Sequence, residues 1–409
     1  MGRVVMVGIL CLAAFVLSLR PLSAQEAKGL GPGWLSLDSS VGLLDKQIQD
    51  GKSALENVLG IQISGFLDTS YTWSSNHPGS GNNNDISLRV FDIDYNDIVF
   101  NHFNLTLERP EPEGGWGIGG KVVADFGRTA ELLREATRWN AKFQTQPSAE
   151  LREAYLTTTL PVGNGLQIKG GLFVTLLGTE IIPNPGAYND NISRSYLFGF
   201  AIPFRHLGVL LSYPLHKTLT LTAGPVTGWD NPHDTNSVPS LLGGITFTPT
   251  ETFSLNSSVV FGAEQDGTSG PKRVAWANVA TFTPTDSLSI GLEYTYGFEQ
   301  NATASLRNAT WQGVGTIISY NWTDCFSTAV RGEFFHDHDG VRLGGEPLGT
   351  RADVKVGEFT LTGAYKFTSQ LLGRLELRQD FANGDVFFKG SSSADRNQTT
   401  LALQGIYTF

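Results

Sequence analysis

The sequence predicts an all-β protein: a transmembrane, up-and-down antiparallel β-barrel of about 16 strands with a short N-terminal helical extension. Three observations predict this fold. Apolar and polar residues alternate with period two through most of residues 60–409, short and long connections alternate between the strands, and the last strand ends on Phe409. Successive side chains of a strand point to opposite faces, so this pattern gives each strand one apolar face and one polar face.

Residues 1–24 have the features of a secretory signal peptide. Arg3 precedes an apolar run from Val4 to Leu19, and Ala24 supplies a small residue where a signal peptidase would cut. Cys11 follows Leu10 rather than Gly or Ala, so we do not expect a lipoprotein anchor. The alternative interpretation is a signal anchor that stays in the inner membrane. No later segment has the ~18 consecutive apolar residues that a membrane helix needs.

Residues 25–59 form a predicted periplasmic extension that is partly helical. Val41, Leu44, Ile48 and Leu55 recur at roughly helical spacing among charged residues, although Gly51 disfavours a helix at its centre. The extension is either a coiled-coil stub or a helix against the barrel mouth, or it is a mobile leader.

Residues 60–409 are predicted to form one barrel, whose strands suit the ~9–11 residues needed to cross a bilayer at a tilt. In the strand at 287–298, Leu292 and Tyr294 lie on one face and Glu293 and Thr295 on the other, which suits lipid outside and water inside. The predicted strands are 61–73, 98–109, 116–126, 150–160, 166–173, 204–213, 219–228, 240–248, 253–262, 273–283, 287–298, 310–322, 326–336, 354–367, 371–381 and 398–409.

The order of the connections is the strongest argument for a barrel. Short links alternate with long, polar, Gly/Asn/Asp-rich segments along the whole chain. An up-and-down barrel with tight periplasmic turns and large outer loops predicts this asymmetry, whereas a soluble Greek-key sandwich, the alternative fold, does not. The short links are 110–115, 161–165, 214–218, 249–252, 284–286, 323–325 and 369–370.

Aromatic residues at strand ends are predicted to lie in two girdles at the membrane interfaces, although in a sandwich they would be core. They are Tyr71, Trp73, Trp116, Tyr213, Trp322 and Tyr407.

Composition excludes several classes of protein. Loss of Arg3 and Arg20 with the signal peptide changes the formal charge from −10 to −12, so nucleic acid is not an expected partner. Cys325 is then the only thiol, which excludes an intramolecular disulfide framework and a cysteine-rich zinc site.

Charged residues on the polar strand faces predict a wet lumen, because a basic residue facing hydrocarbon at the bilayer midplane costs ~2–4 kcal/mol. A barrel of this size is wide enough for an aqueous channel. These inward charges are Arg331, Glu333, Arg374, Glu376, Arg378 and Asp380.

The longest internal connection, residues 174–203, is predicted to constrict the pore. It follows the fifth strand, and in sixteen-stranded porins the third outer loop folds into the barrel. We expect its charged residues Glu180, Asp190 and Arg194 to face Arg331, Arg374 and Arg378 across the pore. The alternative is a loop lying over the mouth.

Short motifs in this region resemble those of one family of outer-membrane proteins, the OmpL-like putative β-barrel porin-2 family. The resemblance covers most of residues 60–409 and implies a porin-like barrel that lets small solutes diffuse. The motifs are Gly178-Thr-Glu180, Arg194-Ser-Tyr196, His206-Leu-Gly-Val209 and Gly224-Pro-Val-Thr-Gly-Trp-Asp230, followed by Asp234 and Asn236.

No catalytic residue, metal site or cofactor is predicted. The chain has no Gly-x-Ser-x-Gly elbow, His-Glu-x-x-His or P-loop. The oxygen-rich stretch from Asp230 to Asn236 lacks the Gly and the distant Glu of a calcium loop, and His336-Asp-His-Asp339 fits an ordinary loop tip better than a metal site.

The predicted function is an outer-membrane porin of a Gram-negative bacterium, a non-enzymatic channel for passive diffusion of small hydrophilic solutes and ions. The acidic balance predicts a weak cation preference. Its expected partners are outer-membrane lipids, the β-barrel assembly machinery, its solutes and, by analogy with porins of this size, two further copies in a homotrimer. Two alternatives remain: a structural or adhesive barrel or the sheath of an electron conduit, and a surface enzyme such as a phospholipase with a Ser/His pair at the rim.

Overall fold

The computed structural model describes residues 60–79, 85–112, 117–136, 149–343, 352–391 and 393–409. Within the predicted N-terminal extension it also describes Lys46, Gly51, Ser53, Glu56 and Val58, and these five residues are helical. The predicted signal peptide, the rest of the extension and Trp116 lie outside the described residues.

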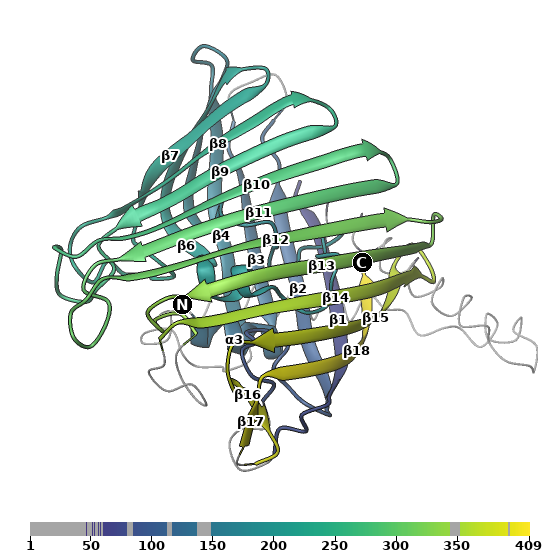
Figure 1. Cartoon of the computed structure of the whole chain (residues 1–409). Coiled ribbons are helices and arrows are strands. Elements are labelled where there is room, and N and C mark those ends of the chain that lie inside the picture. Colours follow the sequence, from purple (N-terminus) through teal and green to yellow (C-terminus); the bar gives the residue numbers. More distant parts are fainter. Residues whose placement is uncertain are drawn as a thin grey trace, which may run out of the picture.

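Sixteen antiparallel strands close into one barrel, in which each strand pairs with its neighbours in the chain and β1 pairs with β18 (Figure 1). A closed barrel leaves no unpaired sheet edge, which is the condition for a sheet to span lipid. The barrel strands are β1 (Gln62–Ser74), β2 (Ile98–Arg109), β3 (Gly119–Phe126), β4 (Ala149–Leu160), β5 (Leu166–Val174), β6 (Arg205–His216), β7 (Leu219–Val226), β8 (Ser240–Thr250), β9 (Phe253–Gly262), β10 (Arg273–Thr285), β11 (Leu288–Glu299), β12 (Ala309–Asn321), β13 (Phe326–Asp337), β14 (Val354–Lys366), β15 (Leu371–Ala382) and β18 (Asn397–Thr408).

The predicted strand order is confirmed, since each predicted strand overlaps one barrel strand and most ends agree within a few residues. The sequence prediction missed three short elements in the long loops: α3 (Arg128–Ala136), the π-helical turn η2 (Leu197–Ala201), and the hairpin of β16 (Phe387–Lys389) and β17 (Ser393–Asp395). The hairpin projects from the end of the barrel that carries the long loops, below called the loop end (Figure 1).

The outer face of the barrel is apolar. In β11, Leu292 and Tyr294 are 51% and 39% exposed, whereas Glu293 and Thr295 on the opposite face are buried. A band of exposed large apolar side chains is unfavourable in water and matches the lipid-facing surface of a membrane barrel. Among the described residues, no helix has the length and apolar character to cross a membrane.

The aromatic residues predicted for the girdles lie partly exposed or exposed wherever the structure describes them. They are Tyr71, Trp73, Tyr213, Trp322 and Tyr407.

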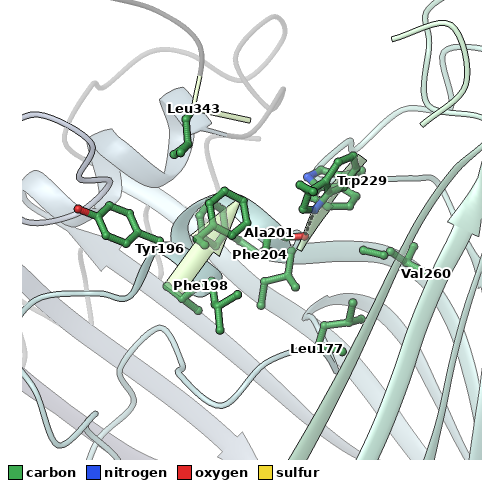
Figure 2. Packing of buried hydrophobic residues seen from close by; sticks show 14 of the residues in the cluster. Leu177, Tyr196, Phe198, Ala201, Phe204, Trp229, Val260 and Leu343 are labelled. Carbon is green, nitrogen blue, oxygen red and sulfur yellow. Dashed lines mark hydrogen bonds between the residues drawn. The ribbon is translucent and has the colours of Figure 1, made fainter. Parts of the chain in front are cut away.

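The hydrophobic core lies inside the barrel, toward the loop end. There, η2 and its flanking residues meet inward side chains from the loop ends of the strands, such as Leu242, Val260 and Phe335. Figure 2 shows Tyr196, Phe198 and other side chains of this cluster, and a dashed line marks the hydrogen bond that Ala201 O accepts from the Trp311 indole. The lumen is therefore partly filled at this end, rather than lined throughout by water as the strand count predicts.

Candidate functional site

The candidate site is the connection between β5 and β6, residues 175–204, which we call the inner segment. Thr175 N donates to Phe204 O at 2.9 Å, so the two ends of the segment lie side by side. Between these ends the chain enters the barrel and returns, and its polar groups bond to inward side chains of the wall. The segment therefore lies inside the barrel, as predicted, and not over its mouth.

Two wall carboxylates bind backbone N–H groups of the inner segment. Glu376 Oε2 accepts a hydrogen bond from Ile192 N at 2.5 Å, and Glu376 Oε1 accepts one from Ser193 N at 2.9 Å. Glu333 accepts from Tyr196 N and, at 3.1 Å, from Leu197 N. These four hydrogen bonds hold the middle of the segment against β13 and β15.

Arg331 is the centre of the ion-pair network. Its guanidinium contacts Glu358 on the neighbouring strand at 2.7 Å and Glu180 of the inner segment at 2.8 Å. It also donates to Ser193 O at 2.6 Å. Arg331 is fully buried, and a buried charge is tolerated only when it is paired and hydrogen-bonded. The side chain therefore fixes the segment and depends on it.

Arg374 and Arg378 bind carbonyl groups of the same segment. Arg374 donates to Asn189 O at 2.5 Å, and Arg378 donates to Arg194 O at 2.6 Å. Arg378 also pairs with Asp380 at 2.8 Å. Each arginine thus neutralises carbonyl dipoles that would otherwise be buried without donors.

Tyr196 lies over this part of the network. Its ring covers the Arg378 guanidinium at 4.9 Å, and its hydroxyl donates to Asp380 at 2.7 Å. Burial raises the pKa of Tyr196 well above its ordinary value, so the hydroxyl stays protonated and remains a donor.

The inner segment also contacts the opposite side of the barrel. Arg152 of β4 donates to Pro183 O at 2.6 Å and to Asn184 Oδ1 at 2.7 Å. On the side of the barrel already described, Tyr188 shares a hydrogen bond of 2.6 Å with the Thr408 hydroxyl at the end of β18, the neighbour of β15. The segment is therefore held from both sides and spans the lumen between them.

Seven of the nine predicted pore residues belong to this network. Glu180 and Arg331, which were expected to face one another across the pore, touch directly, and Arg374 and Arg378 bind the segment's backbone. The physical reason is mutual neutralisation, because a charge that cannot keep its water is stable only beside a partner. The seven residues are Glu180, Arg331, Glu333, Arg374, Glu376, Arg378 and Asp380.

The other two predicted residues lie at the edge of the network. The Arg194 side chain donates to Ile192 O of its own segment at 2.8 Å. Asp190 is exposed. Desolvation by the surrounding protein raises its pKa, while a hydrogen bond from Ser319 and the charge of Arg374 oppose this rise.

A second loop, of which residues 75–79 and 85–97 are described, was not predicted to enter the barrel, but its second part does so. Arg89 pairs with Asp380 at 2.7 Å and with Asp92 at 2.7 Å, and it is buried. The Phe91 ring packs on Phe198 and Phe204 of the inner segment. The sequence does contain a signal for this packing, since the loop contains a cluster of apolar residues: Ile86, Leu88, Val90, Phe91 and Ile93.

Basic side chains also lie on the inner face of β3 to β5. Lys169 Nζ lies 4.8 Å from the centre of the Tyr155 ring, and Lys121 Nζ lies 4.0 Å from Glu108. Both lysines are partly exposed. The inward side chains of β6 to β9 in the half remote from the loop end carry hydroxyl and amide groups instead of charges: Ser212, Thr222, Thr246, Ser254 and Asn256.

The described residues contain no group of three or more His, Cys, Asp or Glu side chains placed to hold a metal ion. Asp234 and Asn236, in the oxygen-rich stretch that begins at Asp230, accept hydrogen bonds from backbone N–H groups two residues ahead and so form ordinary turns. His336 pairs with Asp353 at 2.7 Å and stacks on His338.

Residues 60–409 match the model of a protein family described as "Putative beta-barrel porin-2, OmpL-like". No curated protein sequence matches the chain.

Several solved structures share the fold. The outer membrane channel DcaP of Acinetobacter baumannii is 17% identical with a TM-score of 0.55, and the match covers 85% of this chain and 97% of that one. The anion-selective porin from Comamonas acidovorans is 10% identical, with a TM-score of 0.58 and coverage of 85% and 99%. The trimer form of OmpT from Vibrio cholerae is 12% identical, with a TM-score of 0.55 and coverage of 85% and 99%.

Proposed function

Because this chain belongs to the OmpL-like putative β-barrel porin-2 family and is an outer-membrane channel for passive diffusion, we propose that its inner segment is the constriction of the pore. The observation that carries this proposal is the pair of wall carboxylates, Glu333 and Glu376, that bind four backbone N–H groups of the segment. A loop held in this way keeps a fixed position in the lumen, as a size filter requires.

In this proposal the predicted pore residues have two roles. Arg331, Arg374 and Arg378 and the carboxylates beside them anchor the inner segment, and their charges largely cancel one another. Asp190 and the partly exposed Lys169 are the charges that contribute to the field felt by a passing ion. Selection then depends first on the width left beside the segment and only secondarily on charge.

We propose the same organisation of the whole chain as the sequence predicts. Residues 1–24 direct export and are removed, and residues 25–59 remain as a periplasmic extension. The protein folds with the β-barrel assembly machinery into outer-membrane lipid and forms a homotrimer. The shared fold of OmpT, which has a trimer form, supports the oligomer.

We propose that the protein has no enzymatic activity. A surface phospholipase would need a serine activated by a histidine, and in the part of the chain that the structure describes no serine hydroxyl is hydrogen-bonded to a histidine ring. A structural barrel is the second candidate, and the apolar cluster that fills the loop end of the lumen favours it.

Conductance of the purified, folded protein in a planar lipid bilayer tests the proposed channel. A diffusion pore gives discrete open-channel steps in KCl, and liposomes that contain the protein swell in solutions of small sugars. Absence of both signals from folded protein would reject the channel and favour the structural barrel.

A further inference from the structure

A cavity of about 340 Å³ lies beside the inner segment, toward the loop end of the barrel. Sites for small organic molecules typically enclose ~300–1,000 Å³ and combine apolar walls with a few polar groups. The lining of this cavity includes the apolar side chains of Val90, Phe204 and Trp229 and the charged side chains of Glu264 and Arg342. The polar groups differ in their remaining capacity to bind a solute.

Two of the charged groups are already occupied. Glu264 accepts hydrogen bonds from the Ser240 hydroxyl at 2.6 Å and from Trp229 N at 2.7 Å. Arg273 binds Glu299 through two nitrogen atoms, at 2.8 and 2.9 Å. Burial also raises the pKa of Glu264, which means that its negative charge is disfavoured at this position.

Asp230 is satisfied in the same way. Its Oδ1 accepts hydrogen bonds from Phe204 N at 2.7 Å and from Arg205 N at 3.0 Å. Burial raises the pKa of Asp230 to about 7, against the opposing charges of Arg205 and Arg342. Near neutral pH this carboxyl therefore carries only part of a negative charge.

Arg342 is different, because the acidic side chains near it lie beyond ion-pair distance. Its Nε donates to Phe200 O at 2.6 Å, and its guanidinium lies 4.8 Å from the Trp229 ring and 5.2 Å from the Trp311 ring. No described residue accepts a hydrogen bond from its two Nη atoms, and no described carboxylate lies within ion-pair distance. Burial and the nearby Arg273 lower its pKa to about 10, against the opposing charges of Glu299, Asp337 and Asp230, and a bound anion would offset this shift further.

We propose that this cavity binds a small organic carboxylate on its way into the pore, with the carboxylate on the Nη atoms of Arg342 and the apolar body of the solute against Trp229 and Phe204. A guanidinium is suited to a carboxylate because its planar fork binds both oxygens. The proposal rests on the channel function and adds a class of solute to it.

Titration calorimetry of the folded, detergent-solubilised full chain with benzoate tests the site without requiring conductance. Benzoate is expected to bind saturably, and benzamide, which has the same ring without the charge, is expected to bind at least about tenfold more weakly. Arg342→Gln should weaken benzoate binding by a similar factor. Arg307→Gln removes a basic side chain from an exposed loop outside the cavity and should leave binding unchanged.

Two further variants guard against a folding artefact. Arg342→Lys keeps a cation and should retain part of the binding that Arg342→Gln loses. Glu264→Gln removes a negative charge beside the site and should strengthen benzoate binding, a gain that a misfolded protein cannot produce. Equal binding of benzoate and benzamide, or an Arg342→Gln variant that is folded and binds benzoate normally, overturns the proposal.

The site and the channel can fail separately. If the wild-type protein conducts KCl but binds no benzoate, the channel stands and the site is rejected. If the protein binds benzoate through Arg342 but never conducts, the site stands as a binding site and the channel is rejected.

Discussion

Replacing Glu376 with alanine should release the inner segment from the barrel wall. The change removes the acceptor of the Ile192 and Ser193 N–H groups, both of which are buried. A buried donor without an acceptor costs about 1–3 kcal/mol, so the anchored position loses roughly 2–6 kcal/mol. Even about 3 kcal/mol raises the population of a displaced segment by roughly a hundredfold. The barrel itself should persist, because backbone pairing of Glu376 with Thr362 and Ala402 does not use its side chain.

Single-channel recording with neutral polymers of graded size measures this effect. We expect Glu376→Ala to show larger or noisier conductance and to admit larger polymers than the wild type. Glu376→Gln keeps one amide oxygen as an acceptor and should lie between the two. Glu108→Ala is the matched control, because Glu108 is partly exposed and its one ion pair, with Lys121 at 4.0 Å, does not involve the segment. A folded Glu376→Ala barrel with wild-type conductance and polymer cut-off would refute the anchoring argument.

Three further predictions concern the membrane face, the lumen charge and pH. Leu292→Arg places a charge on the exposed apolar face and should destabilise the barrel by about 2–4 kcal/mol in denaturant titrations in lipid, whereas Leu306→Arg in an outer loop should not. Lys169→Gln should shift the reversal potential in a KCl gradient toward cation selectivity. The control is Lys217→Gln, which changes a lysine in an exposed turn. If the two variants gave the same reversal potential, Lys169 would not lie on the ion path. The pKa of Asp230 is higher in the folded protein than in the unfolded chain, so its ionisation lowers the free energy of unfolding as the pH rises from about 4 through about 7. The denaturation midpoint should therefore fall over this range, and Asp230→Asn should reduce the fall. An identical pH profile for the variant and the wild type would contradict the raised pKa.

The strands could be predicted from the sequence because their signal is local. The alternation in β11 places Leu292 outside and Glu293 inside whatever the rest of the chain does. The alternation of short and long connections then requires an up-and-down order. Neither observation depends on a contact between distant residues, and the closed barrel confirms both.

The interior could be predicted only in part. Alternation identified Arg331 and Arg374 as inward charges, but it could not show that the inner segment would supply their partners. The sequence also gave no indication that Arg89, from another loop, pairs with Asp380 across 291 positions of the chain. Such contacts depend on which loop fills which space, and this is decided by packing in three dimensions rather than by periodicity.

The most direct test of the inner segment as the constriction is to compare the conductance of the wild type with that of a variant in which residues 176–203 are replaced by a short Gly/Ser linker. Thr175 and Phe204 are already hydrogen-bonded to each other, so the linker should join β5 and β6 without straining the barrel. Both proteins should show discrete steps, with a clearly larger conductance for the variant. Equal conductance of the two folded proteins would contradict the assignment of the inner segment as the constriction.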